Sequence, residues 1–266
     1  MADNEIFALL SVPRRIWAIG SVHGEVDRLR DIHRIVLSQF ADGDRLVYLG
    51  NFMGRGEQVR PTIDEMLRLR RKLLARPGMI VEDIVFLRGS QEEMWQKVMQ
   101  LQFAPNPREV LPWVINQGVG ATIQAYGGNL EDGLRAVRDG AVSITRWTNA
   151  LRAALRHAPG HGELMSSLRR AALTDDGAVL LVNAGIDVSR PLTAQSDSFW
   201  WGGTDFATID QPYGEVRKIV RGFDRARLGA VDTEFTLSLD GGCGRGGKLL
   251  AGLLRADGQV QAVYEA

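Results

Sequence analysis

The stretch Gly20-Ser21-Val22-His23-Gly24 ends a short apolar run at residues 15–20 and precedes a segment, 25–40, whose apolar residues recur at helical spacing. It therefore predicts a strand, a glycine-bounded turn and a helix. The same order occurs twice more, around the sequences Gly50-Asn51-Phe52-Met53-Gly54-Arg55-Gly56 and Leu87-Arg88-Gly89-Ser90-Gln91-Glu92. Three such units in succession predict an α/β fold with its functional loops at the carboxyl ends of the strands.

The rest of the chain divides into a helical part and an extended part. Between about residues 105 and 173 the pattern is mostly helical, which predicts a helical insertion. Extended segments return at 179–182, at about 230–239, at 248–255 and at 259–265, with a hairpin turn at Asp257-Gly258. Because no repeat or low-complexity linker interrupts this pattern, we expect a single domain over 14–265, preceded by an N-terminal extension at 1–13.

Composition sets broad limits on the class of protein. Of the 266 residues, 45% are hydrophobic and 24% are charged, which suffices for a large core. Thirty-two basic residues balance 32 acidic ones, so the bulk charge favours neither nucleic acid nor an anionic membrane as a partner. No stretch approaches the ~18 apolar residues of a membrane span, and the first residues lack a targeting signal, so we expect a cytoplasmic protein. The single cysteine, Cys243, is interpreted as a small buried hydrophobe rather than a catalytic thiol.

The three loops together resemble the signatures of the serine/threonine metallophosphatases, within the calcineurin-like phosphoesterase superfamily. Those signatures are Gly-Asp-x-His-Gly, Gly-Asp-x-x-Asp-Arg-Gly and Leu-Arg-Gly-Asn-His-Glu, in the same order, spacing and setting. Further on, Asn183-Ala184-Gly185 resembles the family's His-Ala-Gly segment, and Gly222-Phe223-Asp224 stands where a Gly-His-Thr is expected. The resemblance covers roughly residues 14–265 and implies two packed mixed β-sheets flanked by helices.

The resemblance also implies a catalytic centre of two divalent cations that activate a bridging water. The family's six ligand positions are aspartate, histidine, aspartate, asparagine, histidine and histidine. The matching residues here are Ser21, His23, Asn51, Ser90, Asn183 and Phe223. Only the histidine at position 23 is kept, and neutral hydroxyl and amide oxygens bind Mn²⁺ or iron far more weakly than carboxylates. We therefore expect no metal cofactor.

Proton transfer is affected as well. Gln91 stands where the family keeps the histidine that protonates the leaving group, and Gly54 replaces the aspartate that orients it. The resemblance therefore implies a pseudophosphatase, a binding or regulatory protein whose expected partner is a protein, either phosphorylated or unmodified.

Two arginines of the family pattern survive, Arg55 and Arg88. With His23 they are candidates for phosphate binding, because a guanidinium fork suits a phosphate group. The alternative is structural: the arginines pair with nearby glutamates, and His23 is a hydrogen-bonded remnant.

Two other segments have both a structural and a functional interpretation. Trp200 and Trp201 are candidates for a partner-binding anchor, although tryptophans at such positions more often belong to a core. The segment Gly242-Cys243-Gly244-Arg245-Gly246-Gly247-Lys248-Leu249 nearly matches a phosphate loop, but Leu249 cannot ligate Mg²⁺ and no helix is expected after it. We interpret this segment as a structural turn.

Two alternatives to a protein-binding pseudophosphatase remain open from the sequence. One is a divergent phosphoesterase whose metal site is rebuilt from His23, Asp187, Glu92 or Asp224. The other is a sensor that binds phosphate or a nucleotide in the emptied arginine pocket.

Overall fold

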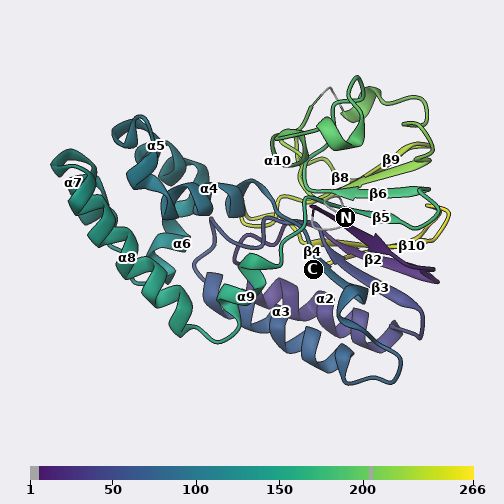
Figure 1. Cartoon of the computed structure of the whole chain (residues 1–266). Helices are drawn as coiled ribbons and strands as arrows, with labels where there is room; N and C mark the ends of the chain where they lie inside the picture. Colours follow the sequence, from purple (N-terminus) through teal and green to yellow (C-terminus); the bar gives the residue numbers. More distant parts are fainter. Residues whose placement is uncertain (1–5, 204–205) are drawn as a thin grey trace.

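The computed structural model describes residues 6–203 and 206–266, which form two mixed β-sheets packed face to face (Figure 1). The first sheet has five strands in the order β11-β10-β2-β3-β4: Val260–Glu265, Leu250–Arg255, Arg15–Ile19, Asp44–Tyr48 and Ile84–Phe86. The second has six strands in the order β1-β5-β6-β7-β9-β8: Phe7–Leu10, Ala171–Thr174, Val179–Val182, Lys218–Arg221, Thr236–Asp240 and Gly229–Asp232.

Alternation along the strands decides which side chains fill the space between the sheets. In β2, Ile16 and Ala18 point toward the six-stranded sheet, where they pack with Leu181 and Val220, whereas Trp17 and Ile19 point toward the helices. All of these side chains are fully buried or nearly so. The sheets are therefore joined by an apolar layer, which fixes the ends of their strands relative to one another.

Helices cover the outer faces. Helices α2 (Val26–Gln39) and α3 (Val59–Leu74) pack on the five-stranded sheet, α4 (Ser90–Met99) follows β4, and α10 (Ser198–Trp201) lies over the other sheet. A helical arm projects to one side of the sheets, as Figure 1 shows. It consists of α5 (Pro107–Val114), α6 (Gly120–Ala125), α7 (Leu130–Asp139), α8 (Ala141–His157) and α9 (His161–Ser166). None of the helices within the described residues has the length and apolar character needed to cross a membrane.

Two short strands lie close to the predicted limits of the N-terminal extension and of the helical insertion. Residues 7–10, which we had placed in an N-terminal extension, form β1 and pair in parallel with β5 at the edge of the six-stranded sheet. Residues 171–173, which we had placed in the helical insertion, belong to β5 itself. Both strands are only four residues long, too short to show a period, and they are stabilised by pairing between distant parts of the chain. Residues 1–5 of the predicted extension lie outside the described residues.

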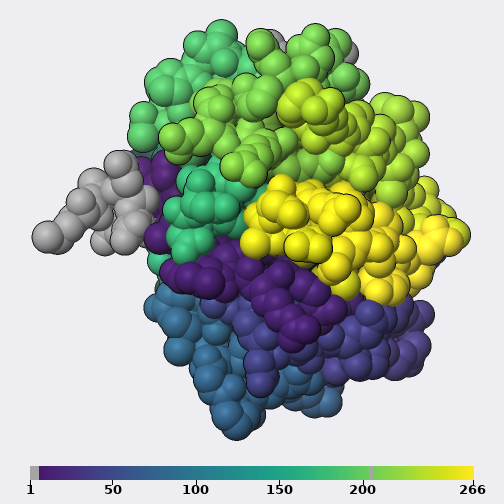
Figure 2. All heavy atoms as spheres, turned by 90° about the vertical axis from the view of Figure 1, so that its right-hand side faces the viewer, coloured from purple at the N-terminus to yellow at the C-terminus, as the bar shows by residue number. Residues whose placement is uncertain are grey.

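The two ends of the chain meet in the five-stranded sheet. Strand β10 pairs antiparallel with β2 over five residues, and β11 completes the edge. In Figure 2 the C-terminal residues, in yellow, lie directly against N-terminal residues in purple. The predicted α/β class, strand-turn-helix units and final hairpin are all present.

Candidate functional site

The predicted site residues gather where the carboxyl ends of the two sheets meet. Ser21 follows β2, Asn51 follows β3 and Ser90 begins α4 after β4, while Asn183 follows β6 and Phe223 follows β7. Leu49 N donates to Ile19 O, which joins the ends of β3 and β2. Phe223 N donates to Asn183 O, which joins the loops after β7 and β6. The sequence argument that the loops meet at the carboxyl ends of the strands is correct.

Hydrogen bonds among neutral groups fill the centre of this site. The Asn51 side-chain amide lies in the middle: its Oδ1 accepts from Ser90 Oγ at 3.2 Å and from the Gln91 backbone N–H at 3.0 Å. Its Nδ2 makes long contacts of 3.4 Å each with Ser21 Oγ and Asn183 Oδ1. An uncharged amide thus lies among groups that would otherwise face a cation.

The remaining donors at these positions are engaged with the backbone. Ser21 Oγ donates to Gly222 O at 2.8 Å, and Asn183 Nδ2 donates to Leu49 O at 2.6 Å. Ser21, Asn51 and Asn183 are buried, and none of them can supply a negative charge. The donor set does not fit a dinuclear centre, because two hard divalent cations need anionic oxygens to offset their dehydration.

The groups proposed for a rebuilt metal site are engaged elsewhere. The Glu92 carboxylate accepts the backbone N–H groups of Asn51, Gly89 and Met53 at 2.8, 2.8 and 3.2 Å, while its burial raises its pKa. Asp224 pairs with Arg221 at 2.9 Å.

Asp187 is engaged as well, since it accepts from Ser189 and pairs with Arg190 at 3.1 Å. Within the described residues, no three His, Cys, Asp or Glu side chains are grouped so that they could hold a metal ion.

His23 is buried and neutral. Its side chain is 4% exposed, and burial, followed by the nearby Arg55 charge, lowers its pKa to about 3. Its Nδ1 has no hydrogen-bond partner among residues 6–203 and 206–266. His23 therefore adds no positive charge to the site at neutral pH. It has a hydrogen bond with the Met53 backbone, as the structural alternative predicts, while its Nδ1 has none among the described residues.

Three non-glycine residues of the site have left-handed backbone conformations. The φ angles are 53° at His23, 54° at Asn51 and 61° at Arg55. Such conformations are unfavourable for residues with a Cβ, and they concentrate where a side chain must be held in a particular place. The loops thus hold these three side chains on a strained backbone.

Arg55 lies at the edge of a cleft of about 460 Å³ beside this network. The cleft is also lined by Gln91, Trp113, Phe223, Trp200 and Trp201, and by three further arginines, Arg225, Arg227 and Arg245. Burial lowers the pKa of Arg55, the charges of Arg245 and Arg227 lower it further, and Asp240 opposes them. The lining of the cleft therefore combines four arginines with aromatic rings, and it includes one carboxylate, that of Asp224.

Of the other candidates from the sequence, Arg88 and Trp200 have mainly structural contacts, whereas Trp201 is partly exposed. Arg88 does not line the cleft; it forms an ion pair with Glu93 at 3.2 Å, which matches the structural alternative. Trp200 is 3% exposed and has Arg170 over its ring, so it is mainly a core residue. Trp201 is partly exposed and packs against Trp113, with ring centroids 5.9 Å apart.

Sequence reasoning missed Arg225, Arg227 and Arg245. The last of these lies in the glycine-rich turn between β9 and β10, which we had interpreted as purely structural. The turn is indeed no phosphate loop, since Leu249 is buried and β10 rather than a helix follows. The arginine within an exposed glycine turn was the one available signal.

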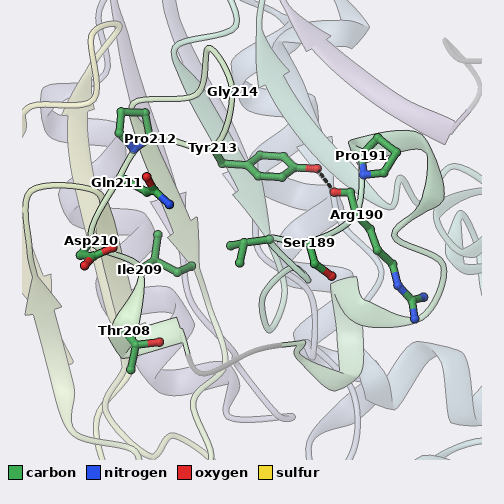
Figure 3. Close-up of a pocket in the computed structure, with 11 residues that line it drawn as sticks. Ser189, Arg190, Pro191, Thr208, Ile209, Asp210, Gln211, Pro212, Tyr213 and Gly214 are labelled. Atoms are coloured by element: carbon green, nitrogen blue, oxygen red, sulfur yellow. Dashed lines mark hydrogen bonds between the residues drawn. The ribbon is translucent and has the colours of Figure 1, made fainter.

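A second cavity, of about 620 Å³, lies away from these loops and is drawn in Figure 3. It lies between two segments, one with Ser189, Arg190 and Pro191 and the other running from Thr208 to Gly214. The Tyr213 hydroxyl donates to the Arg190 carbonyl across it. None of the family-type loop residues lines this cavity, so we assign the candidate site to the arginine cleft.

Comparison with known proteins identifies the fold. No protein-family model matches the chain, and no curated protein matches it in sequence. Among solved structures, a candidate diadenosine tetraphosphatase superposes with a TM-score of 0.56 and 16% identity, covering 97% of each chain.

Cold-active phosphatases are similar too. The cold-active protein-tyrosine phosphatase of a psychrophilic Shewanella species gives a TM-score of 0.50 and 17% identity over 98% of this chain and 84% of its own. The I115M mutant of a cold-active protein tyrosine phosphatase gives 0.52 and 17% over the same shares. The predicted fold of two packed mixed sheets flanked by helices is therefore confirmed and is shared with these phosphatases, at identities that show the fold alone.

Proposed function

We propose that this chain, which has a metallophosphoesterase fold, is a pseudophosphatase that binds a phosphorylated ligand without metal and without hydrolysing it. The observation that carries the proposal is the position of the Asn51 amide, hydrogen-bonded to Ser90 and Gln91 and in long contact with Ser21 and Asn183. Because that amide and its neighbours are uncharged, the site offers no anionic ligand to a divalent cation. A bound water there would have no metal to lower its pKa.

Binding in place of catalysis is supported by the cleft beside this network. Arg55 is half-buried, its Nε has no partner among the described residues, and it forms no ion pair within them. A guanidinium in that state can form charge-assisted hydrogen bonds with phosphate oxygens. The phosphate group would belong either to a partner protein or to a small ligand. The contacts proposed for Arg55 are with the phosphate oxygens and are the same in both cases.

The first test combines metal content with turnover. Purified protein is incubated with Mn²⁺, freed of excess metal and analysed by mass spectrometry, and hydrolysis of p-nitrophenyl phosphate is followed in parallel. We expect metal near zero and a hydrolysis rate equal to the blank. About two retained metals per chain together with ester cleavage would instead establish the divergent phosphoesterase with a rebuilt site.

The second test measures binding by titration calorimetry with inorganic phosphate in the presence of EDTA. We expect saturable binding that Arg55→Gln weakens by about tenfold, the loss of one charge-assisted contact. Arg146→Gln, an exposed arginine on α8 outside the cleft, is the matched control and should bind like the unmodified chain. If the phosphate affinity is the same in all three proteins, the ligand does not bind at Arg55.

A further inference from the structure

The arginine cleft is built from three segments that are far apart in the sequence. Arg55 belongs to the loop after β3, Arg227 follows β7, and Arg245 lies in the turn between β9 and β10. This turn packs closely against the site: a Cβ added at Gly244 would lie 2.4 Å from His23 Cβ and 3.5 Å from Arg55 Cβ. The fold, rather than any one motif, brings these charges together.

Arg227 approaches the same turn from its other side. A Cβ added at Gly242 would lie 3.7 Å from Arg227 Cδ. Arg227 therefore lies along the turn that carries Arg245, next to the segment that packs on Arg55. The three guanidinium groups border one cleft, and the charges of Arg245 and Arg227 add to burial in lowering the pKa of Arg55.

The charge of Asp240 offsets part of the positive charge of these arginines. Within residues 6–203 and 206–266, Arg55, Arg227 and Arg245 form no ion pair with an acidic side chain. Asp224, which also lines the cleft, pairs with Arg221 at 2.9 Å. Asp240 accepts the backbone N–H groups of Asp224 and Gly242 at 2.8 and 2.9 Å. The positive charge of the cleft thus exceeds the negative charge near it.

Two buried polar atoms in the cleft wall also lack partners. Gln91 Oε1 and Trp200 Nε1 are buried without a hydrogen bond among the described residues, and both side chains line the cleft at 2% and 3% exposure. An unsatisfied buried donor or acceptor is costly, and such groups commonly mark a place where a ligand or water supplies the partner. Of the two atoms, only Trp200 Nε1 is a donor whose missing partner an anionic ligand could supply, because Gln91 Oε1 is an acceptor and packs beside Gly54.

We propose that the cleft binds a ligand with two linked phosphoryl groups, one at Arg55 and the other at Arg227 and Arg245. The inference rests on the proposed function and names its ligand class. One phosphate group carries a charge of about −1.5 to −2, and a guanidinium fork typically engages one such group. Three arginines from separate segments therefore match a diphosphate better than a monophosphate.

The ligand can be inorganic diphosphate or the diphosphate group of a nucleotide. Both present the same chemistry to the arginines. Trp113 and the partly exposed Trp201, tilted 52° from one another, line the cleft, where a base could pack. The experiment therefore includes both ligands.

The test is titration calorimetry of the full chain in EDTA at constant ionic strength, with phosphate, diphosphate and adenosine diphosphate. We expect diphosphate to bind about tenfold more tightly than phosphate or better, since it engages a second site. The double variant Arg227→Gln with Arg245→Gln should abolish the preference for diphosphate, so that this variant binds diphosphate no more tightly than phosphate. If adenosine diphosphate binds more tightly than diphosphate, the adenine base contacts the aromatic rings of the cleft.

The matched control replaces two exposed arginines of α8, Arg146 and Arg156, with glutamine, and so removes the same charge elsewhere. Its affinities should equal those of the unmodified chain, and melting temperatures of both double variants verify folding. Equal affinity for phosphate and diphosphate, or equal losses in both double variants, would overturn the two-phosphoryl inference while leaving the proposed function in place. Absence of binding by all three ligands would overturn both.

Discussion

The side chain of Gln91 fills the space beside Gly54, where a Cβ would lie 2.0 Å from Gln91 Oε1. In the family pattern that the loops resemble, position 54 is an aspartate and position 91 a histidine. The two replacements are therefore complementary in volume. The Gln91 Nε2 donates to Gln117 O at 2.9 Å, so the glutamine also connects the loop to the helical arm.

Because of this packing, Gly54→Asp should destabilise the protein. The new side chain would collide with Gln91, and the residue would keep a φ of +79°, a strained conformation for aspartate. We expect a loss of about 2 to 4 kcal/mol in the free energy of unfolding, measured by urea denaturation.

Gly78→Asp is the matched control, since Gly78 has a φ of +80° and nothing within 4 Å of its added Cβ. It reports the backbone strain alone and should cost about 1 kcal/mol. Combining Gly54→Asp with Gln91→Ala should recover part of the difference. Equal losses at the two glycines would show that Gln91 does not set the size of the pocket.

A chain of hydrogen bonds, mostly buried, connects β3 with helices α2 and α3. Tyr48 OH contacts His33 Nε2 at 2.8 Å, His33 Nδ1 contacts Glu65 Oε1 at 2.6 Å, and Arg68 donates to the same carboxylate. Burial alone would raise the pKa of Glu65, but the hydrogen bonds from His33 and Arg68 outweigh it and lower the pKa to about 2. The carboxylate joins α2, α3 and β3.

The contribution of Glu65 to stability should depend on pH. Its pKa is lower in the folded chain than the ordinary value of 4.5, so the contribution is complete above about pH 4.5 and is lost as the pH falls toward 2. Glu65→Gln should cost about 1.5 to 3 kcal/mol at pH 7 and less at pH 3, by urea denaturation.

Glu234→Gln, at an exposed glutamate outside this chain of hydrogen bonds, should change stability little at either pH. If Glu65→Gln costs as much at pH 3 as at pH 7, the carboxylate charge is not the source of the stabilisation.

At the level of elements, the helical arm is attached to the site through one irregular turn. Residues Ile115–Val119 form a π-helical turn, and Gly118 within it has a φ of 111°. Its carbonyl accepts the Arg55 backbone N–H at 2.9 Å, and Thr122 Oγ1 accepts that of Gly54 at 3.1 Å. The arm thus holds the backbone on which the cleft arginine sits.

Gly118→Ala should therefore weaken phosphate binding without touching a charge. A Cβ at this position would lie 2.7 Å from Arg55 Cγ and would displace it. We expect phosphate affinity in EDTA to fall by about tenfold, measured by calorimetry. Gly127→Ala, at a glycine with a φ of +78° and nothing within 4 Å, should leave the affinity unchanged. Equal affinities in the two variants would contradict the coupling.

The elements differed in how well the sequence predicted them. The three strand-turn-helix units were predictable because each is a local pattern of apolar spacing closed by glycine. Strands β1, β5 and β7 were missed, and length alone does not explain this, because β6 has the same four residues and was predicted. Strand β1 is held by its pairing with β5, more than 160 residues further along the chain. Local patterns carry no information on such pairing.

At the scale of the whole molecule, the net charge of zero gives no sign of the positively charged cleft. Basic and acidic residues are equal in number at 32 each, yet Arg55, Arg225, Arg227 and Arg245 border one cleft. The family-type loops predicted Arg55 from its motif. The other three could not be predicted, because they come from loops that only the packing of the two sheets brings beside it.

The pairing of β2 with β10 has a consequence for synthesis on the ribosome. Arg15–Ile19 are made before their partner strand, Leu250–Arg255, and strands β3 to β9, all the described helices and Arg245 lie between the two in the sequence. Contacts of such high sequence separation form late and slowly. The nascent chain must therefore carry an unpaired edge of β2 until residues 250–255 have been made, and until Arg245 has been made the arginine cleft does not yet exist.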